Sequence, residues 1–207
     1  CKVSLLEHLQ SQAYKDRLVQ YGMLPCLPDN PLCVFIGRLT AQKGVDLLIA
    51  AMETLIATDS SCQFLVFGSG SADYEGELIR LAERDEGRVC FLKGFDPVIA
   101  HSVYAAGDLF LIPSRYEPCG LTDYIAQLLG TLPVVHHVGG LVKVVDDETG
   151  FAYRGESVTA LVEALTRALG VYRHEPDRFK KMQQTAVERI ERLHTWKQVM
   201  TAYQALY

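Results

Sequence analysis

Residues 108–122 read DLFLIPSRYEPCGLT, an apolar run that ends in a polar turn. The run Leu109–Ile112 predicts a short buried strand, and the mostly apolar stretch Tyr124–Leu129 predicts a helix that ends at Gly130. The residues between them therefore form a strand-to-helix turn.

This turn offers both hydrogen-bond donors and an acceptor. We expect the amides of Gly120, Leu121 and Thr122 to point out of the helix start, where their partial positive charge suits a phosphate or a sugar hydroxyl. The carboxylate of Glu117 adds an acceptor beside them, although a glutamate before a proline also suits an ordinary first helical turn.

A second turn of the same kind lies at residues 37–44, which read GRLTAQKG. It follows the apolar run 32–36 and precedes the apolar stretch 45–51. Arginine brings a planar fork and lysine a mobile point charge, so Arg38 and Lys43 together suit a pyrophosphate whose charge grows as it leaves. Taken alone, they could equally be solvated charges near a helix start.

Short apolar runs alternate regularly with amphipathic stretches along the chain. The predicted strands are Leu32–Gly37, Cys62–Phe67, Val89–Leu92, Leu109–Ile112 and Leu132–Val135. The predicted helices are Lys43–Thr58, Ala72–Glu83, Val98–Tyr104, Gly120–Leu129, Ser157–Tyr172, Pro176–Arg192 and Trp196–Leu206. This alternation predicts an α/β fold with a doubly wound, Rossmann-like parallel sheet that binds ligands at the carboxyl ends of its strands.

The chain divides into two parts on this interpretation. Residues 1–30 form a linker helix at Lys2–Tyr21 and an interdomain segment rich in Pro, Asp and Asn, and residues 31–207 form the Rossmann-like domain. We expect the three helices after Phe151 to cover the sheet.

Several motifs occur in an order that is typical of one family. They include the two turns, Gly68-Ser69-Gly70 after a strand, Gly139-Gly140-Leu141 and Trp196 near a Tyr-rich end. The chain from Lys15 to Tyr207 resembles bacterial glycogen synthases and plant starch synthases. In that family these motifs belong to the C-terminal, donor-binding half of a two-domain GT-B glycosyltransferase. The resemblance therefore implies that the N-terminal GT-B domain is missing here, and that the isolated domain is inactive. Because the last helix of the family crosses back to that domain, the resemblance also implies that Trp196, Tyr203 and Tyr207 are partly exposed here.

The resemblance also implies a reaction and a role for each motif. The reaction is transfer of glucose, with retention, from ADP-glucose or another nucleotide sugar to the non-reducing end of an α-1,4-glucan acceptor. Catalysis is assigned to Arg38, Lys43 and Glu117, without a covalent nucleophile, metal or cofactor. The residues assigned to nucleotide-sugar binding are Gly68, Ser69, Gly70, Phe95, Ser114, Cys119, Gly120, Leu121 and Thr122.

Some of these positions have simpler interpretations. Phe95, where the family often has a tyrosine that stacks on the base, could be an ordinary core aromatic, and Cys119 could be a small packing residue. Gly68-Ser69-Gly70 could mark only a tight turn. Lys143 departs from the Asp that the family usually has, which predicts altered pairing within its loop.

Composition excludes several other classes. The 207 residues carry a formal net charge of −5 and no basic stretch that alternates with aromatics, so we expect no nucleic-acid partner. No apolar stretch approaches a membrane span, so we expect no membrane partner. The six cysteines lack metal-ligand spacing, and reduced thiols predict a cytoplasmic location, or the plastid stroma in a plant or alga.

Two alternative functions remain open at this stage. One is a non-catalytic module that binds a nucleotide or a glucan without transfer. The other is a GT-B transferase for a different nucleotide sugar.

Overall fold

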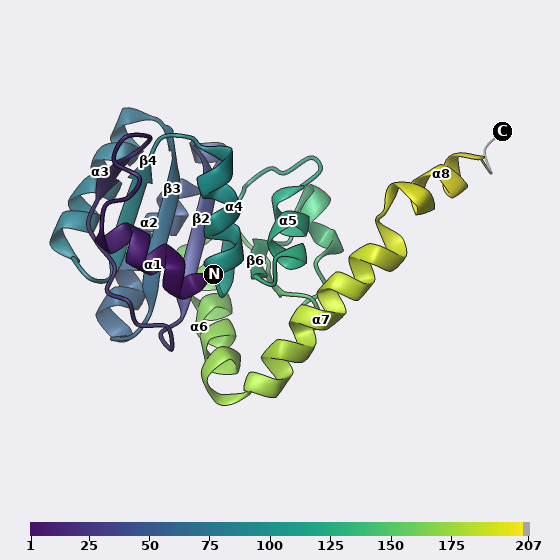
Figure 1. Ribbon diagram of the computed structural model, residues 1–207. Coiled ribbons are helices and arrows are strands. Elements are labelled where there is room, and N and C mark those ends of the chain that lie inside the picture. Colours follow the sequence, from purple (N-terminus) through teal and green to yellow (C-terminus); the bar gives the residue numbers. More distant parts are fainter. Residues whose placement is uncertain (205–207) are drawn as a thin grey trace.

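A computed structural model describes residues 1–204, shown in Figure 1. A seven-stranded sheet lies between layers of helices, and a long helical arm leaves the body at the C-terminal end. The strands are β1 (Val19–Tyr21), β2 (Leu32–Leu39), β3 (Gln63–Gly70), β4 (Val89–Lys93), β5 (Leu109–Ile112), β6 (Leu132–His136) and β7 (Phe151–Tyr153). The helices are α1 (Lys2–Gln10), α2 (Val45–Thr58), α3 (Ala72–Arg84), α4 (Pro97–Ala106), α5 (Thr122–Leu128), α6 (Val158–His174), α7 (Pro176–Leu193) and α8 (Trp196–Gln204), with short 3₁₀ helices η1 (Ala41–Lys43) and η2 (Gly139–Lys143).

The order of the strands fixes where a ligand can bind. Across the sheet it is β1-β4-β3-β2-β5-β6-β7, and every pair is parallel except β1 with β4. The chain builds outward from β2 to β4, then crosses back to place β5 on the other side of β2. This reversal makes the gap between the carboxyl ends of β2 and β5 the topological switch point, where open α/β sheets bind ligands. The predicted doubly wound fold is confirmed.

Side-chain alternation along the strands divides the core between the two faces of the sheet. In β2, Cys33 and Phe35 pack on one face while Leu32 and Val34 pack on the other. Helices α2, α3 and α6 cover the first face, and α1, α4 and α5 contribute to the second. Because both faces are covered, the central strands are apolar throughout, as the sequence pattern predicted.

The N-terminal segment differs from the predicted long helix Lys2–Tyr21. The helix α1 ends at Gln10, Gln12 adopts a positive φ of 51°, and the chain then forms β1 antiparallel to β4. Helix α1 packs on the domain, because its side chains Leu5, Leu6 and Leu9 are buried in the core. The prediction missed β1 because this edge strand has only three residues and Val19 is exposed, so the sequence shows no clear apolar pattern there.

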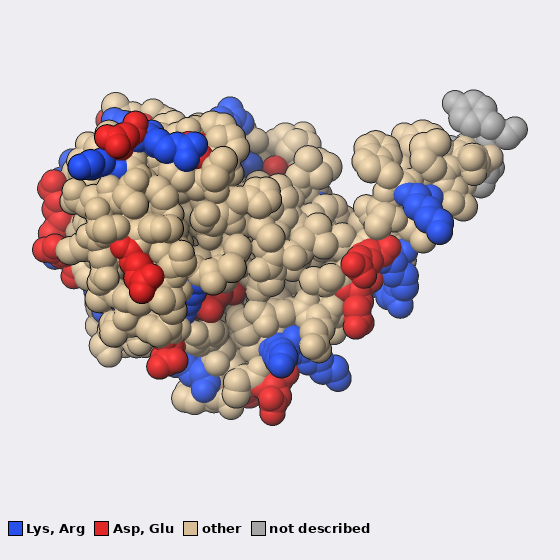
Figure 2. All heavy atoms as spheres, in the orientation of Figure 1, with Lys and Arg blue, Asp and Glu red and all other residues tan. Residues whose placement is uncertain are grey.

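The C-terminal helices also correct a prediction. Helix α6 packs on α2 and β7, and α7 packs on α5 and α6, but α8 does not cover the sheet. Figures 1 and 2 show α8 standing clear of the body at the end of the arm. Trp196 is 79% exposed and Tyr203 is 55% exposed, whereas Tyr207, also expected to be exposed, lies outside the described residues.

Smaller differences lie at the two turns that matter most. The predicted helix Lys43–Thr58 begins two residues later, because Gly44 has a φ of 68° and separates η1 from α2. The predicted helix Gly120–Leu129 begins at Thr122, because Gly120 has a φ of 66°. A helix cannot continue through a left-handed residue, so both glycines end a loop rather than begin a helix.

Candidate functional site

The two turns identified in the sequence meet at the switch point. The ammonium nitrogen of Lys43, after β2, lies 2.6 Å from Oε2 of Glu117, after β5. Ser114 donates its hydroxyl proton to the same oxygen at 3.1 Å. Glu117 is 9% exposed and Ser114 is fully buried, so these groups form a rigid, partly desolvated constellation. Residues 74 positions apart in sequence are thus brought together by the crossover from one half of the sheet to the other.

Two features hold the turn after β2 close to the turn after β5. A Cβ atom on Gly44 would lie only 2.1 Å from the carbonyl oxygen of Pro113, so no larger residue fits at this crossing. Arg115 donates two parallel hydrogen bonds to Asp46, at 2.6 and 2.7 Å, and a third to the carbonyl of Ala41 at 2.7 Å. The side-chain hydrogen bond from Arg115 lowers the pKa of Asp46. Sequence reasoning gave Arg115 no role, although its place in the motif beside Glu117 was a signal.

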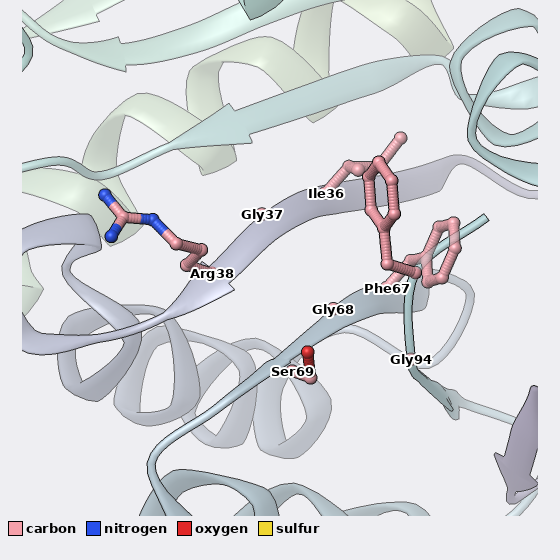
Figure 3. A pocket seen from close by; sticks show the side chains of 8 residues that line it. Ile36, Gly37, Arg38, Phe67, Gly68, Ser69 and Gly94 are labelled. Carbon is pink, nitrogen blue, oxygen red and sulfur yellow. The ribbon is translucent and has the colours of Figure 1, made fainter. Parts of the chain in front are cut away.

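A cavity of about 260 Å³ lies at the carboxyl ends of β2, β3 and β4, and Lys43, Ser114 and Glu117 are not among the residues that line it. Figure 3 shows Gly37 and Gly68 side by side on neighbouring strands, with Arg38 at the end of β2. A Cβ on Gly68 would lie only 1.9 Å from the carbonyl oxygen of Gly37, so the close approach of the two strands requires a glycine here. The lining residues are Ile36, Gly37, Arg38, Phe67, Gly68, Ser69, Gly94 and Phe95.

The predicted binding residues differ in how they relate to this cavity. Phe95 lines it and is 78% exposed, so it is not an ordinary core aromatic. Ser69 also lines the cavity and is exposed, whereas the amide of Gly70 donates to Oε1 of Glu75 at 3.0 Å and Gly70 is not part of the lining. Arg38 is exposed and forms no ion pair with any residue in the range 1–204. Its guanidinium is therefore available to an anion.

The turn Cys119–Thr122 presents backbone rather than side-chain chemistry. Leu121 is 62% exposed, and Cys119 is exposed as well. Within the described part of the chain, the amides of Leu121 and Thr122 donate to no backbone carbonyl. They remain available as donors at the edge of the site, as the sequence predicted from the helix start.

The loop after β6 supports this turn from the other side. The amide of Gly140 donates to the carbonyl of Glu117 at 2.7 Å, and a Cβ on Gly140 would lie 1.9 Å from the carbonyl oxygen of Cys119. Lys143 donates to the carbonyls of Cys119 and Gly120. Lys143 therefore places a cation beneath the turn.

His136 supports the constellation from the core. Its Nδ1 lies 3.0 Å from the carbonyl oxygen of Ser114, so Nδ1 carries the proton and donates it. The ring is buried and stacks on Tyr153 with a centroid separation of 5.2 Å. His136 thus holds Ser114 in place.

The described residues lack a metal cluster and a membrane-spanning helix. Within residues 1–204, no three His, Cys, Asp or Glu side chains cluster in a way that could hold a metal ion. No helix in the same range combines the length and apolarity that a membrane crossing needs.

The fold and the site define a Rossmann-like α/β domain with a candidate ligand site at its switch point, and comparison with known proteins narrows that class. The family model described as "Glycosyl transferases group 1" matches residues 30–170. The chain belongs to this family of glycosyltransferases.

Curated relatives and solved structures agree with this assignment. Glycogen synthase from Cellvibrio japonicus is 40% identical over 188 residues, which cover 86% of this chain and 38% of that protein. Glycogen synthase from Anaeromyxobacter dehalogenans is 40% identical over 202 residues, covering 94% and 41%. The catalytic domain of starch synthase IV from Arabidopsis thaliana, solved with ADP and acarbose, superposes with a TM-score of 0.80 at 28% identity, covering 100% of this chain and 42% of that one.

The extent of these matches is informative. The chain spans about 40% of the length of the curated relatives it matches. By contrast, the C-terminal domain of a glycosyl transferase group 1 family protein from Francisella tularensis is covered to 99%, with a TM-score of 0.68 at 19% identity. That likeness shows a shared fold for a domain of the same extent.

Proposed function

We propose that this chain is the donor-binding domain of a retaining glucosyltransferase of the glycogen and starch synthase type. The donor is ADP-glucose, and glucose passes to the non-reducing end of an α-1,4-glucan. The observation that carries the proposal is the meeting of Lys43 and Glu117 at the switch point, together with a cavity at the carboxyl ends of β2–β4 that Arg38 and Phe95 line. The names of the glycogen synthase relatives, and the ADP bound in the starch synthase IV structure, support the choice of donor.

Each part of the donor meets a matching part of the site. The base stacks on Phe95 in the cavity, and the diphosphate lies along Arg38 and Lys43. The amides of Leu121 and Thr122 add donors to the diphosphate, and Glu117 with the Cys119–Gly120 backbone orients the glucose. Fixed positive charge then stabilises the diphosphate as it leaves, while orientation supplies most of the remaining rate.

The Lys43–Glu117 ion pair sets the order of events. The ammonium of Lys43 lies 2.6 Å from the carboxylate of Glu117. A diphosphate carries more charge than a carboxylate, so it draws the ammonium toward itself and frees lone pairs of Glu117 for the sugar hydroxyls. Donor binding therefore prepares the carboxylate that orients the glucose.

The acceptor belongs to a part of the enzyme that this domain does not supply. We place the acceptor site on an N-terminal GT-B domain that packs against the carboxyl edge of this sheet and along the exposed arm of α7 and α8. The match to about 40% of the relatives' length supports this arrangement. The isolated domain should bind donor and transfer nothing. The free state of all six cysteines supports a reducing compartment, the bacterial cytoplasm or the plastid stroma.

Calorimetric titration with ADP, UDP and ADP-glucose tests the proposal, together with a transfer assay on glycogen. Lys43→Ala should weaken ADP binding by about tenfold or more, because it removes a charge-assisted contact to the diphosphate. Lys93→Ala is the matched control: Lys93 ends β4 at the same edge and pairs with Glu75 at 2.7 Å, but it does not line the cavity. Equal affinity of wild type and Lys43→Ala for ADP would refute the assigned role.

The same experiment separates the two alternatives. Preferential binding of UDP would point to a transferase for another nucleotide sugar. If the domain binds ADP-glucose but supports no transfer when a glycogen synthase N-terminal domain is supplied, a non-catalytic module is the better description.

A further inference from the structure

Lys143 is a nearly buried lysine whose partners all belong to one turn. Its ammonium donates to the carbonyl of Cys119 at 2.8 Å and to the carbonyl of Gly120, and it lies 3.3 Å from Oδ1 of Asp123. The side chain is only 15% exposed. The two carbonyls are the hydrogen-bond acceptors of the ammonium among residues 1–204, whereas Asp123 contributes its charge, since neither of its carboxylate oxygens has a hydrogen-bond partner in that range.

The contacts of Lys143 with two carbonyls also fix the direction of two amides on the opposite side of the turn. A peptide group is planar and trans, so its C=O and its N–H point in opposite directions. The carbonyl of Cys119 shares a peptide group with the amide of Gly120, and the carbonyl of Gly120 shares one with the amide of Leu121. By holding both carbonyls, Lys143 directs both amides away from itself.

The backbone conformation makes the two amides converge. Gly120 has a left-handed φ of 66°, and Leu121 follows in the right-handed region with φ −99° and ψ −24°. Adjacent residues of opposite hand direct successive N–H groups into one concavity, which suits an anion or an electron-rich oxygen. A cation behind the carbonyls also polarises the peptide groups and strengthens their N–H groups as donors.

Two neighbours keep the ammonium in place. Asp123 is fully buried and supplies the counter-charge, and the ring of Tyr124 lies 3.8 Å from the ammonium nitrogen. The aromatic face adds a cation–π contact on a side where no oxygen lies. The cation is thus held by the start of α5 itself, next to the amides that it orients.

We propose that Lys143 is a positioning residue that aims the amides of Gly120 and Leu121 at the bound nucleotide sugar. The inference rests on the proposed function, which places the donor on that side of the turn. Lys143 touches no substrate. It acts by fixing two peptide planes.

The test compares two lysines with similar surroundings. Lys143→Met removes the charge and keeps the apolar stem. Lys2→Met is the control, because Lys2 is 14% exposed, pairs with Asp108 at 2.6 Å, and lies 5.6 Å from the ring of Tyr172, at the opposite edge of the sheet. Both variants lose a buried ion pair, so a purely structural effect should appear in both.

The first measurement needs no ligand. In a ¹H–¹⁵N spectrum of the free chain, the signals of Gly120 and Leu121 should shift in Lys143→Met and stay in place in Lys2→Met. The second is the affinity for ADP-glucose, which should fall by about tenfold in Lys143→Met and by less than about twofold in Lys2→Met. Lys143→Arg, which keeps the charge and several donors, should recover most of the affinity.

Unmoved signals and an unchanged affinity in Lys143→Met would overturn the inference. Failure of the proposed function would look different: Lys43→Ala would then bind ADP-glucose as well as wild type does. In that case the spectrum alone decides whether Lys143 orients the turn.

Discussion

Lys2 and Lys143 are both nearly buried lysines that pair with an aspartate beside a tyrosine ring. They lie at opposite ends of the parallel strands, Lys2 at the amino ends (the amino edge) and Lys143 at the carboxyl ends (the carboxyl edge). At the amino edge, Lys2 binds Asp108, whose carboxylate also accepts from the amide of Leu32 at 2.7 Å. That pair joins α1 to the starts of β2 and β5. At the carboxyl edge, Lys143 holds a turn whose amides face outward.

The difference lies in what each edge leaves unused. The polar groups around Lys2 bind one another and stabilise the fold. The carboxyl edge leaves an exposed guanidinium at Arg38, free amides at Leu121 and Thr122, and an exposed ring at Phe95. Polar groups without a partner inside the protein indicate where a ligand can bind. The two ends of the strands differ in this respect, although both contain the same residue types.

Gly140→Ala should have the largest effect, because it breaks the carboxyl edge directly. The new Cβ would lie 1.9 Å from the carbonyl oxygen of Cys119, so either the turn or the loop must move. We expect a loss of about 3 kcal/mol in the free energy of unfolding, measured in urea, and weaker binding of ADP-glucose. Gly170→Ala is the control: no atom lies within 4 Å of its added Cβ in α6, so it should stabilise the chain by up to about 1 kcal/mol. Similar unfolding curves for the two variants would show that the turn tolerates displacement.

Phe95→Ala should have the next largest effect, and on binding alone. The ring is 78% exposed, so its removal should leave stability nearly unchanged. Loss of stacking on the base should weaken ADP binding by about 1.5 kcal/mol and leave inorganic pyrophosphate unaffected. Leu27→Ala removes an exposed apolar side chain, 45% exposed, from the amino edge, and should change neither affinity. An unchanged ratio of ADP to pyrophosphate affinity in Phe95→Ala would exclude the stacking role.

The smallest expected effect is a pH dependence of stability that arises from Asp123, the partner of Lys143. Burial raises the pKa of Asp123 to about 6, against the attraction of Lys143. The folded carboxyl therefore holds its proton more tightly than the unfolded one, whose pKa is near 3.8, and this group favours folding increasingly as the pH falls through about 6. Between about pH 7 and about pH 5 the gain should be about 1 kcal/mol.

The measurement is the stability of wild type minus that of Asp123→Asn, followed by urea unfolding across this range. Asp108→Asn serves for comparison, because burial also raises the pKa of Asp108 while Lys2 opposes that rise. A difference for Asp123→Asn that does not change with pH would mean that its carboxyl stays ionised in the folded state.

The sequence predicted the sheet well wherever burial on both faces made the strand apolar. The run Leu109–Ile112 matches β5 residue for residue, because such a strand has a continuous apolar signal, here bounded by Asp108 and Pro113. The edge strands β1 and β7 were missed, since three residues are too few for a pattern, and pairing with a distant strand defines them.

The site was predicted only in part, for a physical reason. The motif residues could be named, but the 2.6 Å contact between Lys43 and Glu117 depends on the crossover that places β5 beside β2. Arg115 and Lys143 were missed as supports because their partners are backbone carbonyls and charges from other segments. No local spacing in the sequence records such contacts. The roles of the site residues themselves remain predictions.

The ion pair between Lys43 and Glu117 has a consequence for how the domain attracts an anion. The pairing with Glu117 neutralises the charge of Lys43, so the long-range attraction of the site for an anion is weaker than its number of basic residues suggests. Association with a nucleoside diphosphate should then depend only weakly on ionic strength, because the ligand exchanges with an internal carboxylate rather than with dissolved counterions. Such a domain would select its ligand mainly through direct contacts in the site, and only weakly through long-range attraction.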